Sequence, residues 1–309
     1  MGDTTWTVDA GDAGVRLDKF LAAPDRAGSR ARAAAALERG KVFVNGDEAG
    51  AGEAARRLAA GDAVRLWMDR PGSSRARREP TSIGDLRVVY EDDALMVVDK
   101  PAGMLSVPLP VRSASPSARE LLEEHQRPAR RLHVVHRIDE YTSGLIIFAR
   151  TMAAQTELKG QFRRREPERI YLAVVYGHPH PDAGVWRDYV VWDERAMVQK
   201  ETHPRDPNAK EAISHYRVRE RFDGAALIEV QLETGKRNQI RLQARLRGHT
   251  LVGEQRYVFG PEQLRGIPFG RQALHAHRLA FRHPQDGREL RFESPLPPDM
   301  AALVARLRR

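Results

Sequence analysis

The order of strand-like and helix-like segments predicts an α+β protein, with a small α+β module at the N-terminus and a larger domain built on a mixed, largely antiparallel sheet. Three observations lead to this fold class. Apolar strand segments outnumber helical ones, most strands follow one another through short hairpin-like turns, and helices do not alternate regularly with strands. A doubly wound parallel sheet would require that alternation, so the chain favours the mixed sheet.

The N-terminal module covers residues 1–67 and combines two short helices with short strands. In RLDKFLA the apolar side chains recur at helical spacing. Ser29 is placed to cap a second helix, RARAAAALER, and the turn dipeptide Asn45-Gly46 ends the strand KVFVNG. The strand AVRLW follows. These elements predict a small independent α+β domain.

Residues 68–86 contain proline, glycine, serine and four arginines with little apolar content, which predicts an exposed linker. Residues 87–309 then form one large domain. RVVYEDDALMVVDKP contains two apolar strands around an acidic turn, and LIIFAR and IYLAVVYG are further strands separated by a helix over about residues 151–165. SHYRVRERFDGAALIEVQLETG is typical of a long hairpin, KRNQIRLQARLRG of a helix that ends at Gly248, and HAHRLAFRHP of a late strand.

The charge of the chain favours a polyanionic partner. Its 309 residues carry a formal net charge of +9 at pH 7, and nucleic acid is the commonest polyanion that a basic protein binds. The chain has no cysteine, which excludes disulfides, thiolate nucleophiles and cysteine-ligated metal centres. No signal peptide is visible and no apolar run approaches the ~20 residues of a membrane span. We therefore expect a cytoplasmic protein with no membrane partner.

The common motifs of cofactor chemistry are absent from the sequence. It contains no P-loop, dinucleotide fingerprint, nucleophile elbow or HExxH motif, so we expect neither ATP nor nicotinamide chemistry. His178 and His180 alternate as metal ligands on a strand can, and so do His275 and His277. Because neither pair has an obvious third ligand, we expect no metal site.

The stretch HRIDEYTSGLIIFAR, residues 136–150, places Arg137 and Asp139 directly before an apolar strand. A charged side chain next to a core is costly unless it is paired. One interpretation is a structural ion pair at the end of the strand, and the other is a reactive carboxylate where water is scarce. The residues leave both open. Ile138, between the two charges, is expected to point into the core.

Five segments in order resemble the RluA-type pseudouridine synthases, which isomerise uridine in RNA. HRIDEYTSGLIIFAR resembles the family signature, YEDDALMVVDKPAGMLSVP its opening strand pair and Lys-Pro-x-Gly turn, and RIYLAVVYG the strand that bears its active-site tyrosine. LETGKRNQIRLQARLRGHTLVGEQRY resembles the segment that contains its ile-arg pair, and LHAHRLAFRHP its closing strand. The segment RLDKFLA to KVFVNG resembles an S4 RNA-binding module. Together these segments cover nearly the whole chain.

The resemblance implies the pseudouridine synthase fold for residues 87–309 and an isomerase that needs no cofactor. It implies that Asp139 is the catalytic carboxylate, that Arg241 keeps it ionised, and that Tyr171 stacks under the flipped base. We expect Arg137 to brace the position that the base vacates. RNA contacts are also expected from Lys100, Gln239 and Lys236 in the large domain and from Arg16, Lys19, Arg30 and Arg32 in the S4-like module.

Some residues depart from the family pattern. Asn238 and Gln243 replace usual histidines, Lys236 a usual arginine and Glu254 a usual aspartate. The sequence does not decide whether Asp139 attacks C1′ or removes a proton from C2′. The S4-like module favours ribosomal RNA over transfer RNA, and we expect a monomer. The alternatives are a transfer-RNA enzyme, a catalytically silent RNA-binding protein of the same fold, and a histidine-ligated metal hydrolase.

Overall fold

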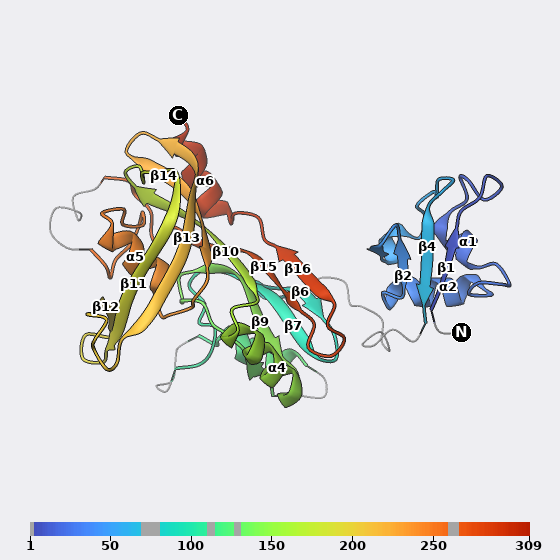
Figure 1. The fold of residues 1–309 in the computed structure, drawn as a ribbon, viewed down its shortest axis with the longest axis horizontal. Helices are drawn as coiled ribbons and strands as arrows, with labels where there is room; N and C mark the ends of the chain where they lie inside the picture. Colours follow the sequence, from blue (N-terminus) through green and yellow to red (C-terminus); the bar gives the residue numbers. More distant parts are fainter. Residues whose placement is uncertain (1–2, 69–80, 110–114, 127–130, 259–265) are drawn as a thin grey trace. The chain divides into compact units, whose positions relative to one another are not determined.

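The computed structural model describes residues 3–68, 81–109, 115–126, 131–258 and 266–309 (Figure 1). Its contacts divide the chain into two compact units, Met1–Pro80 with Tyr90–Ala94 and Thr81–Val89 with Leu95–Arg309. Most of the predicted linker, residues 69–80, lies outside the described residues. The rest is not all linker, because β5 (Thr81–Ile83) pairs with β6 (Leu86–Glu91). The predicted linker therefore extended too far into the sheet.

The first unit contains a four-stranded antiparallel sheet and two short helices. In sheet order the strands are β1 (Asp3–Thr7), β4 (Ala63–Trp67), β2 (Val42–Val44) and β3 (Asp47–Ala49), and the helices are α1 (Leu17–Leu21), α2 (Arg30–Glu38) and the 3₁₀ turn η1 (Ala51–Glu53). Ser29 caps α2 as expected, by accepting a hydrogen bond from the Arg32 amide. The sequence did not reveal β1, because none of its residues is buried and it shows no apolar alternation.

The second unit is built on one twelve-stranded sheet, which confirms the mixed, largely antiparallel sheet (Figure 1). The main path across it is β12-β11-β13-β14-β10-β15-β9-β7-β6-β5, and β16 pairs with β15 while β8 pairs with β9. The remaining bounds are β7 (Leu95–Lys100), β8 (His133–Val134), β9 (Ser143–Ala149), β10 (Glu168–Tyr176), β11 (Ala183–Asp193), β12 (Val198–Glu201), β13 (Lys210–Phe222), β14 (Ala225–Leu232), β15 (Leu274–Arg282) and β16 (Glu289–Glu293). β13 and β14 form the long hairpin that the sequence predicted.

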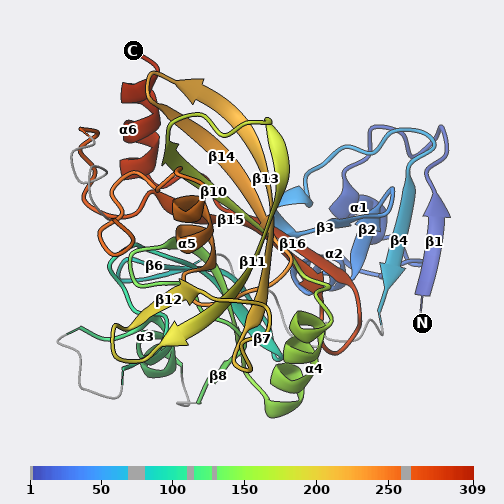
Figure 2. The ribbon, with the colours of Figure 1, turned by 60° about the vertical axis from the view of Figure 1, so that its left-hand side comes forward.

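Within the described residues, four helices accompany this sheet: α3 (Ala118–His125), α4 (Met152–Arg163), α5 (Gln239–Leu246) and α6 (Pro298–Leu307). Helix α5 lies against the long strands β11, β13 and β14 (Figure 2). Its residues Ile240 and Ala244, four positions apart, are buried in one core cluster with Trp186 of β11, Tyr216 of β13 and Val230 of β14. Among the described residues, no helix has the length and apolar character needed to cross a membrane.

The start of β9 packs closely against β15, which lies beside β10, and this close contact requires a glycine. Gly144 has a φ of 110°, and a Cβ atom there would lie 2.2 Å from the carbonyl oxygen of Ala276 on β15. Gly144 pairs with Ala276 in parallel register, and Ala276 in turn pairs with Tyr171 on β10. Three strands therefore bring the residues around Asp139 and Tyr171 to one part of the sheet.

Candidate active site

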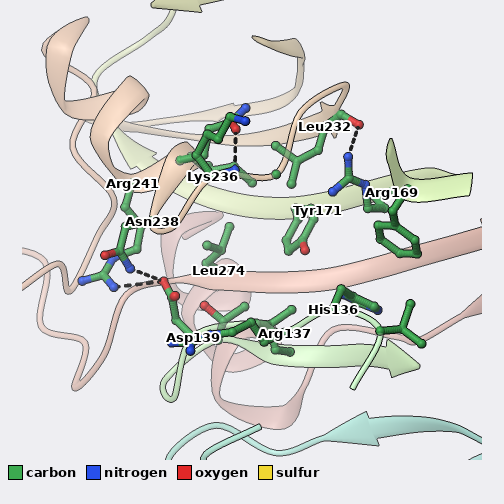
Figure 3. Close-up of a pocket in the computed structure, with 17 residues that line it drawn as sticks. His136, Arg137, Asp139, Arg169, Tyr171, Leu232, Lys236, Asn238, Arg241 and Leu274 are labelled. Carbon is green, nitrogen blue, oxygen red and sulfur yellow. Dashed lines mark hydrogen bonds and ion pairs between the residues drawn. The ribbon is translucent and has the colours of Figure 1, made fainter. Parts of the chain in front are cut away.

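A cavity of about 300 Å³ lies between the loop before β9, strand β10 and the start of α5 (Figure 3). This volume is at the lower end of the range for small-molecule sites. Asp139, Tyr171 and Arg241, which come from these three elements, all line the cavity. The structure thus brings together three residues that are widely separated in the sequence.

The Asp139 carboxylate is held from one side. Arg241 Nη1 and Asn238 Nδ2 both donate hydrogen bonds to Asp139 Oδ2, at 3.1 Å and 2.6 Å (Figure 3). No donor among the described residues binds the other oxygen, Oδ1, and the side chain is 22% exposed. Both bonds are made to one carboxylate oxygen, and Arg241 adds a positive charge beside it. The second oxygen remains free for a group in the cavity.

Arg241 is fixed by a second carboxylate. Its Nε and Nη2 donate to Glu254 at 2.7 Å and 2.6 Å, and the Glu254 side chain is fully buried. Burial alone would lower the pKa of Arg241, but the hydrogen bonds and charges of Glu254 and Asp139 outweigh this effect and raise it. Arg241 therefore remains a cation and presents one edge of its guanidinium to Asp139.

Asn238 has a fixed orientation. The Tyr257 hydroxyl donates to Asn238 Oδ1 at 3.2 Å and accepts a hydrogen bond from the Gln199 amide at 2.9 Å. Since the amide oxygen is occupied, the amide nitrogen is the atom that faces Asp139. Asn238 adopts a left-handed backbone conformation with φ of 53° immediately before α5, a conformation that asparagine tolerates better than most residues.

Tyr171 forms a flat wall of the cavity. It is 8% exposed, and its hydroxyl has no hydrogen-bond partner among the described residues. Burial raises the pKa of Tyr171 to about 12, with Asp139 adding to the shift and Arg169 opposing it. The hydroxyl is therefore neutral near pH 7 and can donate a proton in a hydrogen bond, while the ring offers a surface on which a base can stack.

Comparison with known proteins identifies the family. The family model for RNA pseudouridylate synthase matches residues 94–246. An uncharacterized RNA pseudouridine synthase of Bacillus subtilis, YlyB, is 36% identical over 299 residues, covering 95% of this chain and 94% of its own length. The ribosomal large subunit pseudouridine synthase D of Nitrosomonas europaea is 33% identical over 314 residues, covering 98% and 87%. The chain belongs to the RNA pseudouridine synthase family.

The solved structures agree with this pseudouridine synthase fold. The structure of human RNA pseudouridylate synthase domain containing 4 has a TM-score of 0.57 at 23% identity, covering 72% of this chain and 92% of its own. The predicted α+β fold of an RNA pseudouridine synthase is therefore confirmed, and the enzyme class is an isomerase. Within the described residues, no group of three histidine, aspartate or glutamate side chains is arranged to hold a metal ion.

In this pseudouridine synthase, hydrogen bonds between Ser106 and the backbone of Ile138 hold the segment around Asp139 in place. Ile138 is 6% exposed and lies in the core, as expected, and its carbonyl and amide both bind the Ser106 hydroxyl, at 2.7 Å and 3.3 Å. Arg137 is exposed and lines the cavity, and no described carboxylate pairs with it. Lys236 also lines the cavity and is only partly buried. Both cations are available to a ligand.

Lys100, which the sequence predicts to contact the substrate, is buried and bound by protein groups. Lys100 is 1% exposed, and its ammonium donates to the carbonyl oxygens of Pro101, Met104 and Glu140 at 2.7–2.9 Å. An ammonium has three protons, so none remains for a substrate. Burial lowers the pKa of Lys100 to about 7. Its bond to the Glu140 carbonyl, next to Asp139, indicates that it holds the loop in place.

Gln239, also predicted to contact the substrate, has its hydrogen-bonding groups bound by the protein in the same way. Its Oε1 accepts from the Thr234 hydroxyl and the Lys236 amide, and its Nε2 donates to the Ile213 carbonyl and the Ser214 hydroxyl. These four bonds, at 2.8–3.0 Å, use the capacity of a 3% exposed amide side chain. Gln239 lies at the wall of the cavity, but its amide group is used to join the start of α5 to β13.

The four cations expected to contact RNA in the first unit are exposed on α1 and α2: Arg16, Lys19, Arg30 and Arg32. Arg16 is less available for a phosphate than the sequence suggests, because its guanidinium pairs with Asp18 through two hydrogen bonds of 2.9–3.0 Å. The hydrogen bonds from Arg16 lower the pKa of Asp18, and Arg30 adds to this effect. The remaining three have no described ion-pair partner.

Sequence reasoning gave two cavity residues, His136 and Arg169, no role in the catalytic site, although Arg169 was one of the basic residues predicted to follow an RNA backbone. His136 opens the stretch on which the prediction rested, and Arg169 stands two positions before Tyr171 on β10, where alternation places both on one face. The two-residue spacing on a strand could have predicted that Arg169 lies on the same face as Tyr171. Glu254 and Asn238 were noticed only as departures from a family pattern, and their contacts with Arg241 and Asp139 became apparent only in three dimensions.

Proposed function

We propose that this protein isomerises uridine to pseudouridine in large-subunit ribosomal RNA and that Asp139 is its catalytic carboxylate. The observation that supports this role is the pairing of Asp139 Oδ2 with Arg241, with Oδ1 left free at the wall of the cavity. A purely structural ion pair would have no need of a cavity or of an unoccupied oxygen. The same pairing places a positive charge beside the carboxylate, and either route of attack requires a carboxylate anion.

The reaction breaks the bond between ribose C1′ and N1, turns the uracil, and joins C5 to C1′. In one route Asp139 Oδ1 attacks C1′, and in the other it removes a proton from C2′. In both routes the uracil leaves with the electron pair of the broken bond. The C5–C1′ bond then forms, the proton on C5 is lost and N1 gains a proton, so the nucleoside is isomerised without any net change in atoms or electrons.

The nucleotide has to leave the RNA stack to reach the cavity. Tyr171 supplies a buried aromatic surface for the extruded base, and its neutral hydroxyl, which has no partner among the described residues, offers a hydrogen bond to the base while the C5 proton is lost. Arg137 stands exposed beside Asp139, where it can fill the gap that the base leaves. These roles place the sugar near Asp139 and the base over Tyr171.

Ribosomal RNA is the favoured substrate because several similar proteins carry that name, including those of Nitrosomonas europaea and Zymomonas mobilis, both named ribosomal large subunit pseudouridine synthase D. The exposed cations of α1 and α2 add positive charge suited to a phosphate backbone. We propose that the first unit is an S4-like module that binds this RNA. Transfer RNA is the alternative substrate.

The test uses large-subunit ribosomal RNA and bulk transfer RNA, each transcribed with tritium on uridine C5. Wild-type protein should release tritium from the ribosomal RNA, and Asp139→Asn should lower the rate by at least about 10³-fold, because an amide is neither a nucleophile nor a base. The matched control is Asp182→Asn, which breaks an exposed pair with Arg221 and should leave the rate unchanged.

Equal release by wild type and Asp139→Asn would remove Asp139 from the mechanism. Release from transfer RNA alone would overturn the proposed substrate but not the chemistry. RNA binding of Asp139→Asn, measured by filter retention, shows that a lost rate is not lost binding.

A further inference from the structure

Arg169 is a buried cation without a counter-charge. It is 8% exposed, lines the cavity, and pairs with no carboxylate in the described part of the chain. Its Nη2 donates to the carbonyl oxygens of Leu232 and Glu233 at 3.3 Å and 3.2 Å, while its Nε is buried with no hydrogen-bond partner. A charge held in this way is costly, and burial lowers the pKa of Arg169. Because an uncompensated buried charge lowers stability, its presence in the cavity indicates a function that needs it.

The surroundings hold the guanidinium in place without neutralising it. The guanidinium carbon lies 5.3 Å from the centre of the Phe162 ring, on which His136 stacks at 4.9 Å. His136 Nε2 accepts a hydrogen bond from the Ile147 amide, so the imidazole is neutral, and burial followed by the charge of Arg169 lowers its pKa to about 3. A Cβ atom on Gly235 would lie 2.5 Å from Arg169 Nη1. The absence of a side chain there makes room for the cation.

Tyr171 lies between Arg169 and Asp139 in the cavity (Figure 3), and the charges of both affect the pKa of its hydroxyl. A nucleoside with its sugar at Asp139 and its base over Tyr171 therefore directs the base toward Arg169. We propose that Arg169 binds a carbonyl oxygen of the substrate uracil and stabilises the uracil anion that forms when the C1′–N1 bond breaks. This inference rests on the proposed function.

The chemistry of uracil fits a fixed cation. When the C1′–N1 bond breaks, the electron pair stays on N1 and is delocalised onto O2 and O4, so negative charge develops on the carbonyl oxygens. A cation already in place stabilises that charge without reorganisation. Turning the ring about its N3–C6 axis exchanges N1 with C5 and the two carbonyl oxygens with each other. Arg169 therefore retains an oxygen partner before and after the turn, as the C5–C1′ bond forms and the C5 proton is lost.

The test compares Arg169→Met and Arg169→Lys with wild type in single-turnover reactions at saturating enzyme, on large-subunit ribosomal RNA transcribed with C5-tritiated uridine. Methionine keeps the unbranched chain beside Phe162 without the charge. We expect its rate to fall about 10²–10³-fold while its RNA dissociation constant changes less than about threefold. Lysine should restore part of the rate because it restores the charge. Unfolding temperatures check that both variants are folded.

A second transcript, made with 5-fluorouridine, separates a catalytic role from a structural one. Fluorine stabilises the departing anion by itself, so the ratio of wild-type to Arg169→Met rates should be smaller with this RNA, measured as rearranged nucleoside after nuclease digestion. An equal ratio with both RNAs would overturn the inference, as would an unchanged rate in Arg169→Met.

The comparison for Arg169 is Arg137, a second arginine that lines the same cavity but is exposed. Arg137→Met should weaken RNA binding and reduce its salt dependence by about one phosphate contact. If Arg169→Met behaved in this way instead, with its rate at saturation unchanged, Arg169 would be a phosphate ligand and the inference would fail. A wild-type protein that releases no tritium would refute the proposed function and not this inference alone.

Discussion

Two arginines of the same cavity are buried to a similar degree but differ in their partners. Arg241, at the Asp139 end, binds the fully buried Glu254 through two hydrogen bonds and Asp139 through a third. Arg169, beyond Tyr171, binds two neutral carbonyl oxygens and leaves its Nε without a partner. Burial alone therefore does not reveal what a cation does. The first arginine holds another residue in place, whereas the second remains available for negative charge that arises only during the reaction.

The largest effect on stability is expected from Arg241→Met. The substitution leaves Glu254 buried without its cation, which costs about 3–5 kcal/mol of unfolding free energy. Arg169→Met should change the unfolding free energy by less than about 1 kcal/mol, because it removes an uncompensated charge as well as two hydrogen bonds. Urea denaturation of both variants checks the contrast.

The double variant Arg241→Met/Glu254→Gln separates stability from activity. It should regain most of the lost unfolding free energy, because no buried charge is left alone, yet it should stay inactive, because Asp139 still lacks its cation. Similar losses of stability in the two single arginine variants would contradict the distinction between the two ends of the cavity.

A smaller effect is expected from Asn238→Asp, which replaces a donor to Asp139 by a like charge of the same shape. Asp139 then loses a hydrogen-bond donor and faces a second carboxylate, so the single-turnover rate at saturating enzyme should fall about tenfold. Asn208→Asp, the same substitution at an exposed position, is the control. Tritium release at saturating enzyme is the measurement, and an unchanged rate would mean that Asn238 does not act through Asp139.

A pH-dependent effect on stability concerns Lys100, a third buried cation, which is satisfied by three carbonyl oxygens. Its pKa is lowered to about 7 in the folded protein, below its ordinary value of 10.5, so the unfolded chain binds more protons between these values. The lysine therefore makes stability rise with pH from about 7 to 10.5, by up to about 1.4 kcal/mol per pH unit. Lys100→Met should lack this slope in urea denaturation between pH 7 and 10. Parallel slopes would show that Lys100 keeps its proton throughout.

Much of the fold could be predicted from local pattern. The hairpin of β13 and β14 and the core face of α5 follow from apolar spacing, which the chain expresses within a few residues. β1 and β5 could not be found in this way. β1 has no buried side chain, β5 is only three residues long, and both are held by backbone hydrogen bonds to strands whose position the sequence does not reveal.

The sequence by itself determined the fold class, the family resemblance and the meeting of Asp139, Tyr171 and Arg241, because motif order and residue type suffice for these. Only the tertiary structure decided that Lys100 and Gln239 are already saturated by protein groups and that Arg169 is not. The physical reason is that a polar side chain is available to a substrate only if no neighbour has satisfied it. Its neighbours here come from turns and strands far away in the chain, as the carbonyl oxygens around Lys100 and the empty space at Gly235 illustrate.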